Sequence, residues 1–302
     1  MIIPPYLKQG DTVAITCTAK SLPVPIDVAV RLLESWGLKV VLGETVYASW
    51  NQFAGTDELR AADFQRFLDD NSIKAIFAAR GGYGTIRIID SIDFSGFAIN
   101  PKWIVGFSDI TILHSHIHAI HNVQTIHGQM PLTIPDGIKI SLETLRKALF
   151  NEPLEYIYQS SFENRSGSAT GILTGGNLTL LLMMSGSVSE QDYSDKILFL
   201  EDVGEYLYSI DRMMLSFKRA GILSGLKGLI IGGFTDLKDN DIPFGQTAEE
   251  IIMSHVNDYT YPVCFNFPAG HIADNRALIL GKEISLTVES KKVSMKYSIN
   301  SK

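Results

Sequence analysis

Two hydrophobic periodicities alternate along the first half of the chain. Short runs of apolar and β-branched residues predict buried strands at 12–16, 38–42 and 73–79. Between them, apolar residues recur at helical spacing over 25–36 and 56–68. Strands that alternate with helices predict a parallel sheet with helices on both faces. In such a sheet, functional loops follow the carboxyl ends of the strands.

A serine occupies the most informative junction in this half. A predicted strand ends at Gly106, and apolar residues recur at helical spacing from Ile110 onward. At such a turn Ser108 is lifted out of the sheet, with its Oγ exposed above the N-terminus of the helix, as in a nucleophile elbow. The segment keeps the first glycine of G-x-S-x-G and lacks the second, so a plain helix N-cap is the competing interpretation.

A glycine-rich block, 81–84, follows another predicted strand and Arg80, and we expect it to open a helix. One interpretation is a phosphate cradle, although the spacing is neither G-x-G-x-x-G nor that of a P-loop. Another is half of an oxyanion hole, completed by the N–H of Asp109, and a third is a tight turn that needs positive φ. The predicted neighbouring strand that ends at Ser108 favours the oxyanion role.

A polar, irregular stretch over 151–168 marks a predicted domain boundary. This gives a first domain over 1–150, a linker over 151–168 and a second domain over 169–302. The second half mixes strands and helices, and its last two alternating runs, 283–288 and 292–298, predict a hairpin.

The second half offers a base and an acid for Ser108. Glu201 ends a predicted strand, and His271 lies on a loop after another strand. The chain order serine, acid, histidine is that of the α/β-hydrolases. Each residue also has an ordinary interpretation: His271 as a loop histidine bonded to a carbonyl, and Glu201 as a member of an ion pair.

Three imidazoles share one face of the helix predicted after Ser108. His114, His118 and His121 stand at spacings that suit a metal site, but no H-E-x-x-H and no carboxylate accompany them. Contacts on a helix surface or an interface are the competing interpretation.

Two arginines are candidates for holding a substrate carboxylate. Arg80 precedes the glycine block, and Arg212 lies in a charged cluster after Glu201. A guanidinium binds a carboxylate through two parallel hydrogen bonds. Solvated surface ion pairs explain such charges equally well.

Composition narrows the function classes. The 302 residues are 45% hydrophobic and 20% charged, typical of a soluble globular protein. A net charge of −7 without a basic tract argues against nucleic-acid binding. Cys17 and Cys264 provide neither a disulfide framework nor a zinc motif. With no recognisable secretory signal and no apolar run of roughly 18 residues, we expect a cytoplasmic protein without membrane contact.

Together these segments resemble the LD-carboxypeptidase family, serine peptidases that include the microcin-C self-immunity peptidases. The resemblance covers nearly the whole chain. Its blocks are AGTDE at 54–58, ARGGYG at 79–84, GFSDIT at 106–111, HGQM at 127–130, GGN at 175–177, LEDVGE at 200–205, IDRM at 210–213 and PAGH at 268–271, with Asn275.

The resemblance implies an α/β fold, with a flavodoxin-like N-terminal domain and a smaller, β-rich α/β C-terminal domain. It implies a triad of Ser108 as nucleophile, His271 as base and Glu201 as orienting acid, completed across the domain boundary. The implied reaction releases D-alanine from a murein tetrapeptide during peptidoglycan recycling, without metal or cofactor. The diamino acid before the bond, diaminopimelate or lysine, stays open. A homodimer is expected by analogy.

The same resemblance implies an oxyanion hole from the backbone of Gly82 and Asp109, and substrate contacts from Arg80 and Tyr83. The chain departs from the family at 16–20, where many relatives have a turn containing proline and serine. It departs again at 128–129, where Gly-Gln replaces the commoner Gly-Pro. Both departures leave the implied triad intact and bear on substrate choice.

Three other functions compete with murein hydrolysis. An immunity-type peptidase that cleaves peptidyl-nucleotides would need an aromatic platform, for which neither Trp50 nor Trp103 is evidently placed. A binding module that holds murein peptides without cleaving them would not need the intact triad. A metal hydrolase would use the histidine face after Ser108.

Overall fold

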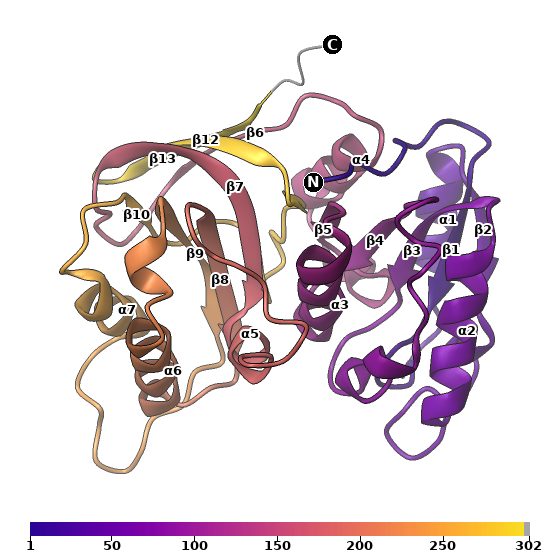
Figure 1. The fold of residues 1–302 in the computed structure, drawn as a ribbon, viewed down its shortest axis with the longest axis horizontal. Coiled ribbons are helices and arrows are strands. Elements are labelled where there is room, and N and C mark those ends of the chain that lie inside the picture. Colours follow the sequence, from indigo (N-terminus) through magenta and orange to yellow (C-terminus); the bar gives the residue numbers. More distant parts are fainter. Residues whose placement is uncertain (299–302) are drawn as a thin grey trace. The chain divides into compact units, whose positions relative to one another are not determined.

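The computed structural model describes residues 1–298, which form two compact units, each with its own sheet (Figure 1). The first unit comprises Met1–Pro153, Gly186–Gln191 and Ala273–Gly281. The second unit takes the remaining described residues. The sequence had not predicted that two segments of the second half belong to the first unit.

The sheet of the first unit has six strands in the order β11-β5-β4-β3-β1-β2. Strands β1 to β5 are parallel in the 2-1-3-4-5 order of flavodoxin-like folds, and β11 adds an antiparallel edge to β5. The strands are β1 (Thr12–Thr16), β2 (Lys39–Leu42), β3 (Ile73–Ala78), β4 (Trp103–Gly106), β5 (Thr125–His127) and β11 (Leu278–Leu280).

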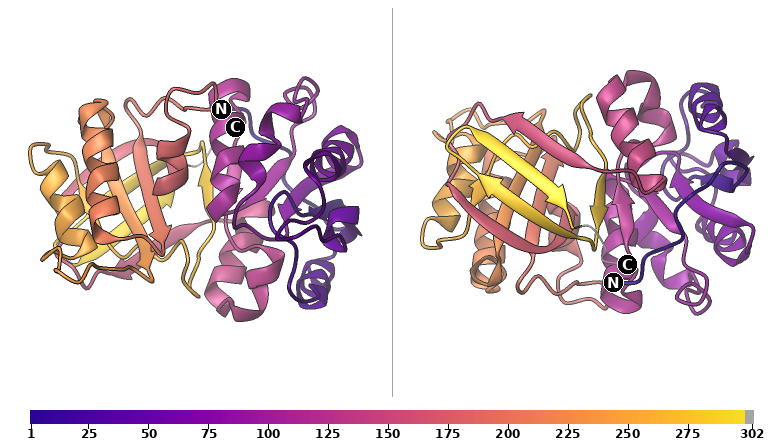
Figure 2. Two further views of the ribbon diagram at one scale, coloured as in Figure 1. Left: turned by 90° about the horizontal axis from the view of Figure 1, so that it is seen from below. Right: turned by 90° about the horizontal axis from the view of Figure 1, so that it is seen from above.

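Helices pack around this sheet (Figure 2). The longest, α2, begins where the side chain of Thr56 accepts a hydrogen bond from the N–H of Leu59, as an N-cap does. The α-helices are α1 (Asp27–Ser35), α2 (Asp57–Asp69), α3 (Thr111–His116) and α4 (Lys139–Leu149). The other helical turns are η1 (Glu44–Val46), η2 (Thr85–Arg87), η3 (Ile89–Ser91), η4 (Ser108–Ile110), η5 (Ile117–His121) and η6 (Pro131–Asp136).

The prediction of a helix after the glycine block is wrong. The single turns η2 and η3 lie between the block and β4. Each glycine costs a helix about 1 kcal/mol relative to alanine. In addition, the backbone N–H of Thr85 donates to the carboxylate of Asp109, 2.9 Å away. The segment therefore forms a turn that is tied to η4.

The second unit is built on a seven-stranded mixed sheet in the order β10-β9-β8-β7-β12-β13-β6. The long strand β7 joins its two halves, pairing in parallel with β8 through residues 173–177 and antiparallel with β12 through residues 167–172. The strands are β6 (Glu155–Gln159), β7 (Gly167–Asn177), β8 (Ile197–Val203), β9 (Gly228–Thr235), β10 (Val263–Cys264), β12 (Glu283–Val288) and β13 (Lys292–Tyr297).

The expected hairpin is confirmed by the antiparallel pairing of β12 and β13. The stretch 151–168, expected to be irregular, instead contains β6, which pairs with β13. Its alternating exposed and buried residues are those of an edge strand. The helices of this unit are α5 (Leu178–Met183), α6 (Leu207–Arg219) and α7 (Ala248–Val256), with the turn η7 (Leu223–Gly225). No helix among residues 1–298 combines the length and apolarity needed to cross a membrane.

Candidate active site

Ser108 lies at a strained turn between β4 and η4. Its φ of 62° is left-handed, a conformation that costs a residue with a side chain about 1–2 kcal/mol. The residue at the N-cap position of η4 is Phe107, not the serine. Gly106 makes the turn possible, because a Cβ there would lie 2.8 Å from Cγ1 of Ile110. These are the features of a nucleophile elbow.

The imidazole of His114 stabilises this turn by a hydrogen bond to its backbone. Its Nε2 donates to the carbonyl oxygen of Gly106 at 2.9 Å, and complete burial lowers the pKa of His114 to about 4. His118 is also buried and its Nε2 lies 3.1 Å from Oγ1 of Thr125. The expectation of surface contacts is therefore wrong for these two histidines. No group of three metal-ligating side chains occurs among residues 1–298.

The glycine block lies directly against the serine. A Cβ on Gly81 would lie 3.3 Å from Oγ of Ser108 and 3.4 Å from the backbone nitrogen of Asp109. Gly82 and Gly84 have φ of 115° and 149°, in the region that favours glycine. The tight-turn interpretation of the block thus holds, and the turn brings Gly81 close to Ser108 and to the backbone nitrogen of Asp109.

Asp109 contributes a carboxylate as well as a backbone nitrogen. It is buried, and burial raises the pKa of this carboxyl above its ordinary value although the bonds from Thr85 oppose the shift. The Thr85 hydroxyl lies 2.8 Å from that of Thr18, in the loop after β1. One chain of hydrogen bonds therefore connects the elbow, the glycine block and the first loop.

Arg60 of α2 is a residue that sequence reasoning missed. Its guanidinium is fully buried and its Nη1 donates to the carbonyl oxygens of Thr18, at 2.6 Å, and Gly84, at 3.0 Å. It also forms an ion pair with Asp57 one turn earlier. The sequence signalled only an ordinary helix-surface ion pair, because Asp57 and Arg60 stand three apart at the start of a capped helix.

The remaining candidates in the first unit differ in how far they are engaged. Arg80 is half-buried and its Nη1 donates to the carbonyl oxygen of Ser21 at 2.5 Å, so one end of its guanidinium holds the loop after β1. Tyr83 is exposed. Cys17 is buried, and burial raises the pKa of its thiol to about 12, so it is a packing residue and not a nucleophile.

In the second unit, Glu201 and His271 form a hydrogen-bonded pair. Nδ1 of His271 lies 2.7 Å from Oε2 of Glu201, whose side chain is fully buried, whereas the imidazole is 21% exposed. Burial alone would lower the pKa of His271, but the charges of Glu201, Asp202 and Asp236 outweigh it and raise the pKa above its ordinary value. The pair is thus built to stabilise an imidazolium, with the Glu201 carboxylate accepting the hydrogen bond from Nδ1.

A bulge and two glycines explain why this pair forms. Strand β9 has one residue more than β8 between the Leu200–Ile231 and Asp202–Phe234 pairs, directly opposite Glu201. A Cβ on Gly232 would lie 2.5 Å from the carbonyl oxygen of Ala269, and one on Gly270 would lie 2.8 Å from Cβ of Glu201. Only glycine lets the segment before His271 approach both strands so closely.

Asp202 points to the other side of the strand and fixes its end. Its carboxylate accepts hydrogen bonds from the Asn177 amide and from the backbone and hydroxyl of Thr179, all within 2.9 Å. This network accounts for Asn177, the last residue of the GGN block. Arg212, the other candidate for a substrate carboxylate, lies over the ring of Tyr208 and contacts the Ser209 hydroxyl.

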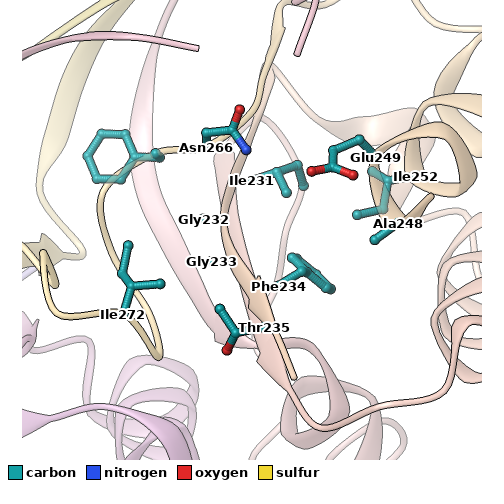
Figure 3. A pocket seen from close by; sticks show the side chains of 11 residues that line it. Ile231, Gly232, Gly233, Phe234, Thr235, Ala248, Glu249, Ile252, Asn266 and Ile272 are labelled. Carbon is teal, nitrogen blue, oxygen red and sulfur yellow. The ribbon is translucent and has the colours of Figure 1, made fainter. Parts of the chain in front are cut away.

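A pocket of about 280 Å³ adjoins the His271 segment within the second unit. Figure 3 shows Glu249 and Ile252 of α7 on one side of it and Ile272 on the other. Most of its lining residues are apolar. The pocket lies next to the segment that carries the imidazole, because Ile272 is one of the residues that line it.

The predicted site residues therefore fall into two groups, each described within its own unit. Ser108 and Asp109 lie together in the first unit, beside Gly81, which had not been predicted as a site residue. Glu201 and His271 lie together in the second. Gly82, predicted for the oxyanion hole, is one residue from the glycine that contacts Ser108.

Two family models match the chain. The LD-carboxypeptidase N-terminal domain matches residues 13–128, and the LD-carboxypeptidase C-terminal domain matches residues 170–286. A probable murein peptide carboxypeptidase of Bacillus subtilis is 33% identical over 295 residues, which are 95% of this chain and 92% of that protein.

Solved structures agree with the fold. The crystal structure of muramoyltetrapeptide carboxypeptidase from Oxalobacter formigenes has a TM-score of 0.86 and 28% identity, and covers 95% of this chain and 99% of that one. The microcin C7 self-immunity protein MccF in complex with aspartyl sulfamoyl adenosine has a TM-score of 0.88 at 21% identity and covers 99% of each chain, a likeness of fold alone. The expected α/β fold is confirmed.

Substituting Ser108 by glycine and by alanine tests the strain at the elbow. Both changes remove the hydroxyl, but only glycine relieves the left-handed backbone, so we expect Ser108→Gly to be more stable than Ser108→Ala by about 1 kcal/mol. Urea unfolding followed by tryptophan fluorescence reports on the first unit, because Trp36, Trp50 and Trp103 all lie in it. Ala62→Gly on the exposed face of α2 is the control and should lose about 1 kcal/mol. A less stable Ser108→Gly would contradict a strained turn.

Alanine at Gly270 tests the close approach that pairs His271 with Glu201. Gly245 also has positive φ but open space around it, so Gly245→Ala isolates the backbone strain. We expect Gly245→Ala to cost about 1 kcal/mol and Gly270→Ala about 2–3 kcal/mol, because the latter also pushes on Glu201. The His271 pKa, measured by NMR, should fall in Gly270→Ala and stay unchanged in Gly245→Ala. Equal effects of the two variants would show that the approach is not tight.

Proposed function

The chain belongs to the LD-carboxypeptidase family, and from that premise we propose that it is a serine peptidase that releases D-alanine from murein tetrapeptides. The membership confirms the resemblance seen in the sequence and makes the chain a carboxypeptidase. The observation that carries the serine mechanism is the left-handed turn at Ser108, which presents a hydroxyl beside the 81–82 peptide.

The proposed triad is Ser108, His271 and Glu201. Nε2 of His271 accepts the Ser108 proton as Oγ attacks the carbonyl carbon between the L-centre of the diamino acid and D-alanine. The carboxylate of Glu201 accepts the hydrogen bond from Nδ1–H and stabilises the imidazolium that forms. The imidazolium then protonates the leaving amine of D-alanine, and an acyl-enzyme remains on Ser108.

Water completes the reaction by the same route. His271 accepts a proton from the water molecule that attacks the ester, and returns it to Oγ of Ser108 as the peptide acid leaves. In both steps the negative oxygen needs hydrogen-bond donors. We assign these to the backbone N–H groups of Gly82 and Asp109, a role supported by the contact of Gly81 with Ser108 and with the Asp109 nitrogen.

We place this reaction in cytoplasmic peptidoglycan recycling. The support is the murein peptide named for the Bacillus subtilis relative and the tetrapeptide named for the Oxalobacter formigenes structure. The side chains of Arg80, which precedes the glycine block, and Tyr83, which lies within it, are the proposed contacts to the peptide. A homodimer stays a prediction.

Hydrolysis of a peptidyl-nucleotide is the second candidate, and one aromatic cluster favours it. The Trp50 ring stacks on Phe53 with centroids 6.2 Å apart, and Phe53 lies 6.1 Å from Tyr83. Trp50 and Tyr83 are exposed, so they offer a nucleobase flat faces beside the glycine block. The sequence had given Trp50 no such place, whereas Trp103 is buried.

Product analysis separates the two candidates. Mass spectrometry of a murein tetrapeptide and of an aspartyl sulfamoyl adenosine, each incubated with the protein, should show loss of one D-alanine from the former. Ser108→Ala and His271→Asn should lower kcat/KM by about 10³-fold or more, because triad members act as a unit. Ser95→Ala, an exposed serine of the same unit, is the control and should keep full activity. Cleavage of the nucleotide alone would overturn the murein proposal.

The pH dependence of kcat/KM tests the assignment of His271 as base. The base must be neutral, so activity falls as pH drops through its pKa, which Glu201, Asp202 and Asp236 raise although burial opposes them. We expect the acid limb of the profile above the ordinary histidine value of about 6.5.

Asp236→Asn should move that limb to lower pH with the plateau preserved, because Asp236 is exposed and acts on the imidazole only through its charge. Asp241→Asn, another exposed carboxylate of the second unit, should leave the profile unchanged. A limb that neither lies above 6.5 nor responds to Asp236→Asn would rule out His271 as the titrating base.

A further inference from the structure

The loop after β1 carries an ammonium group, that of Lys20, which forms no ion pair with a side chain among residues 1–298. Lys20 is half-buried, and its side chain makes no ion pair or hydrogen bond with any residue in the described part of the chain. The loop belongs to the segment 16–20, where the chain departs from the pattern of its relatives. An unpaired cation held against a protein surface is a candidate for binding an anion.

The stem of Lys20 lies across the glycine block. A Cβ on Gly82 would lie 2.6 Å from Cδ of Lys20 and 3.1 Å from its Cε. The preceding residue, Gly81, contacts Ser108 and the nitrogen of Asp109. The Lys20 side chain therefore lies beside the turn that contacts Ser108. Its charge lowers the pKa of the Asp109 carboxyl, which burial raises.

Buried contacts hold the two loops together. Arg60 donates to the carbonyl oxygens of Thr18 and Gly84, and the hydroxyls of Thr18 and Thr85 lie 2.8 Å apart. The segment that carries Lys20 is thus tied, through Thr18, to the C-terminal end of the glycine block. A cation positioned by fixed backbone loses little entropy when it binds a ligand.

A carboxypeptidase must recognise a carboxylate on the residue just after the bond it cuts. Arg80 has one nitrogen of its guanidinium committed to the carbonyl oxygen of Ser21. Lys20 has no such commitment. Resting on the serine carboxypeptidase function proposed above, we propose that the ammonium group of Lys20 binds the C-terminal carboxylate of the peptide substrate and so selects free peptide ends.

The test compares an acid with its amide. The substrate is a murein tetrapeptide with a free C-terminal carboxylate, and the probe is the same peptide with a C-terminal amide, used as a competitive inhibitor. The proteins are wild type, Lys20→Met, Lys20→Arg and Lys8→Met, the last an exposed lysine of the same unit. The readouts are KM and kcat for D-alanine release and the inhibition constant of the amide.

We expect Lys20→Met to raise KM for the acid about 10- to 100-fold, the range for a hydrogen bond between charged groups. The inhibition constant of the amide should not change, because the amide lacks the charge that Lys20 recognises. Lys20→Arg should recover most of the loss, and Lys8→Met should match wild type.

Two results would overturn the inference while the proposed function stands. If Lys20→Met weakens acid and amide equally, Lys20 only supports the loop. If it leaves KM for the acid unchanged, another group binds the carboxylate. Wild type that releases no D-alanine would overturn the proposed function, and this inference with it.

Discussion

The first unit depends on one buried charge. The guanidinium of Arg60 is withdrawn from water and its hydrogen bonds go to two backbone carbonyls and to Asp57. Those carbonyls belong to the loops after β1 and β3, so a helix side chain fixes the spacing of two segments more than 60 residues apart in sequence. A buried cation that lost these partners would be strongly destabilising. The glycine block, and through it the surroundings of Ser108, is held in place by that requirement.

Glycines provide the close approaches that side chains cannot. Gly81 brings a peptide to Ser108 in the first unit, and Gly232 and Gly270 bring the segment before His271 to Glu201 in the second. In each unit a reactive side chain is placed by backbone that packs without a Cβ between. Backbone contacts thus hold the turn at Ser108 and the loop at His271 in place, as preorganised chemistry requires.

The sequence predicted what depends on local pattern. Alternating periods indicated the parallel sheet, and strand ends indicated Ser108, Glu201 and His271. It did not predict the inclusion of Gly186–Gln191 in the first unit, because that depends on tertiary hydrogen bonds such as that from Ser115 to the carbonyl oxygen of Ser189. A tertiary hydrogen bond also explains why no helix follows the glycine block, because the backbone N–H of Thr85 donates to the carboxylate of Asp109. A buried arginine such as Arg60 reads as an ordinary surface residue of an amphipathic helix until its backbone partners are known.

The two reactive groups solve opposite electrostatic problems. Next to Ser108, the carboxylate of Asp109 is buried and tied to Thr85, and burial raises its pKa. This disfavours negative charge beside the oxygen that becomes negative in the proposed mechanism. Around His271 the carboxylates do the reverse: they outweigh burial and favour the charged imidazole. Transfer of a proton from a serine to this histidine would thus place the positive charge on the imidazole, where the neighbouring carboxylates stabilise it. That division follows from which side chains each strand end carries, and it is the physical basis for assigning opposite roles to the two groups.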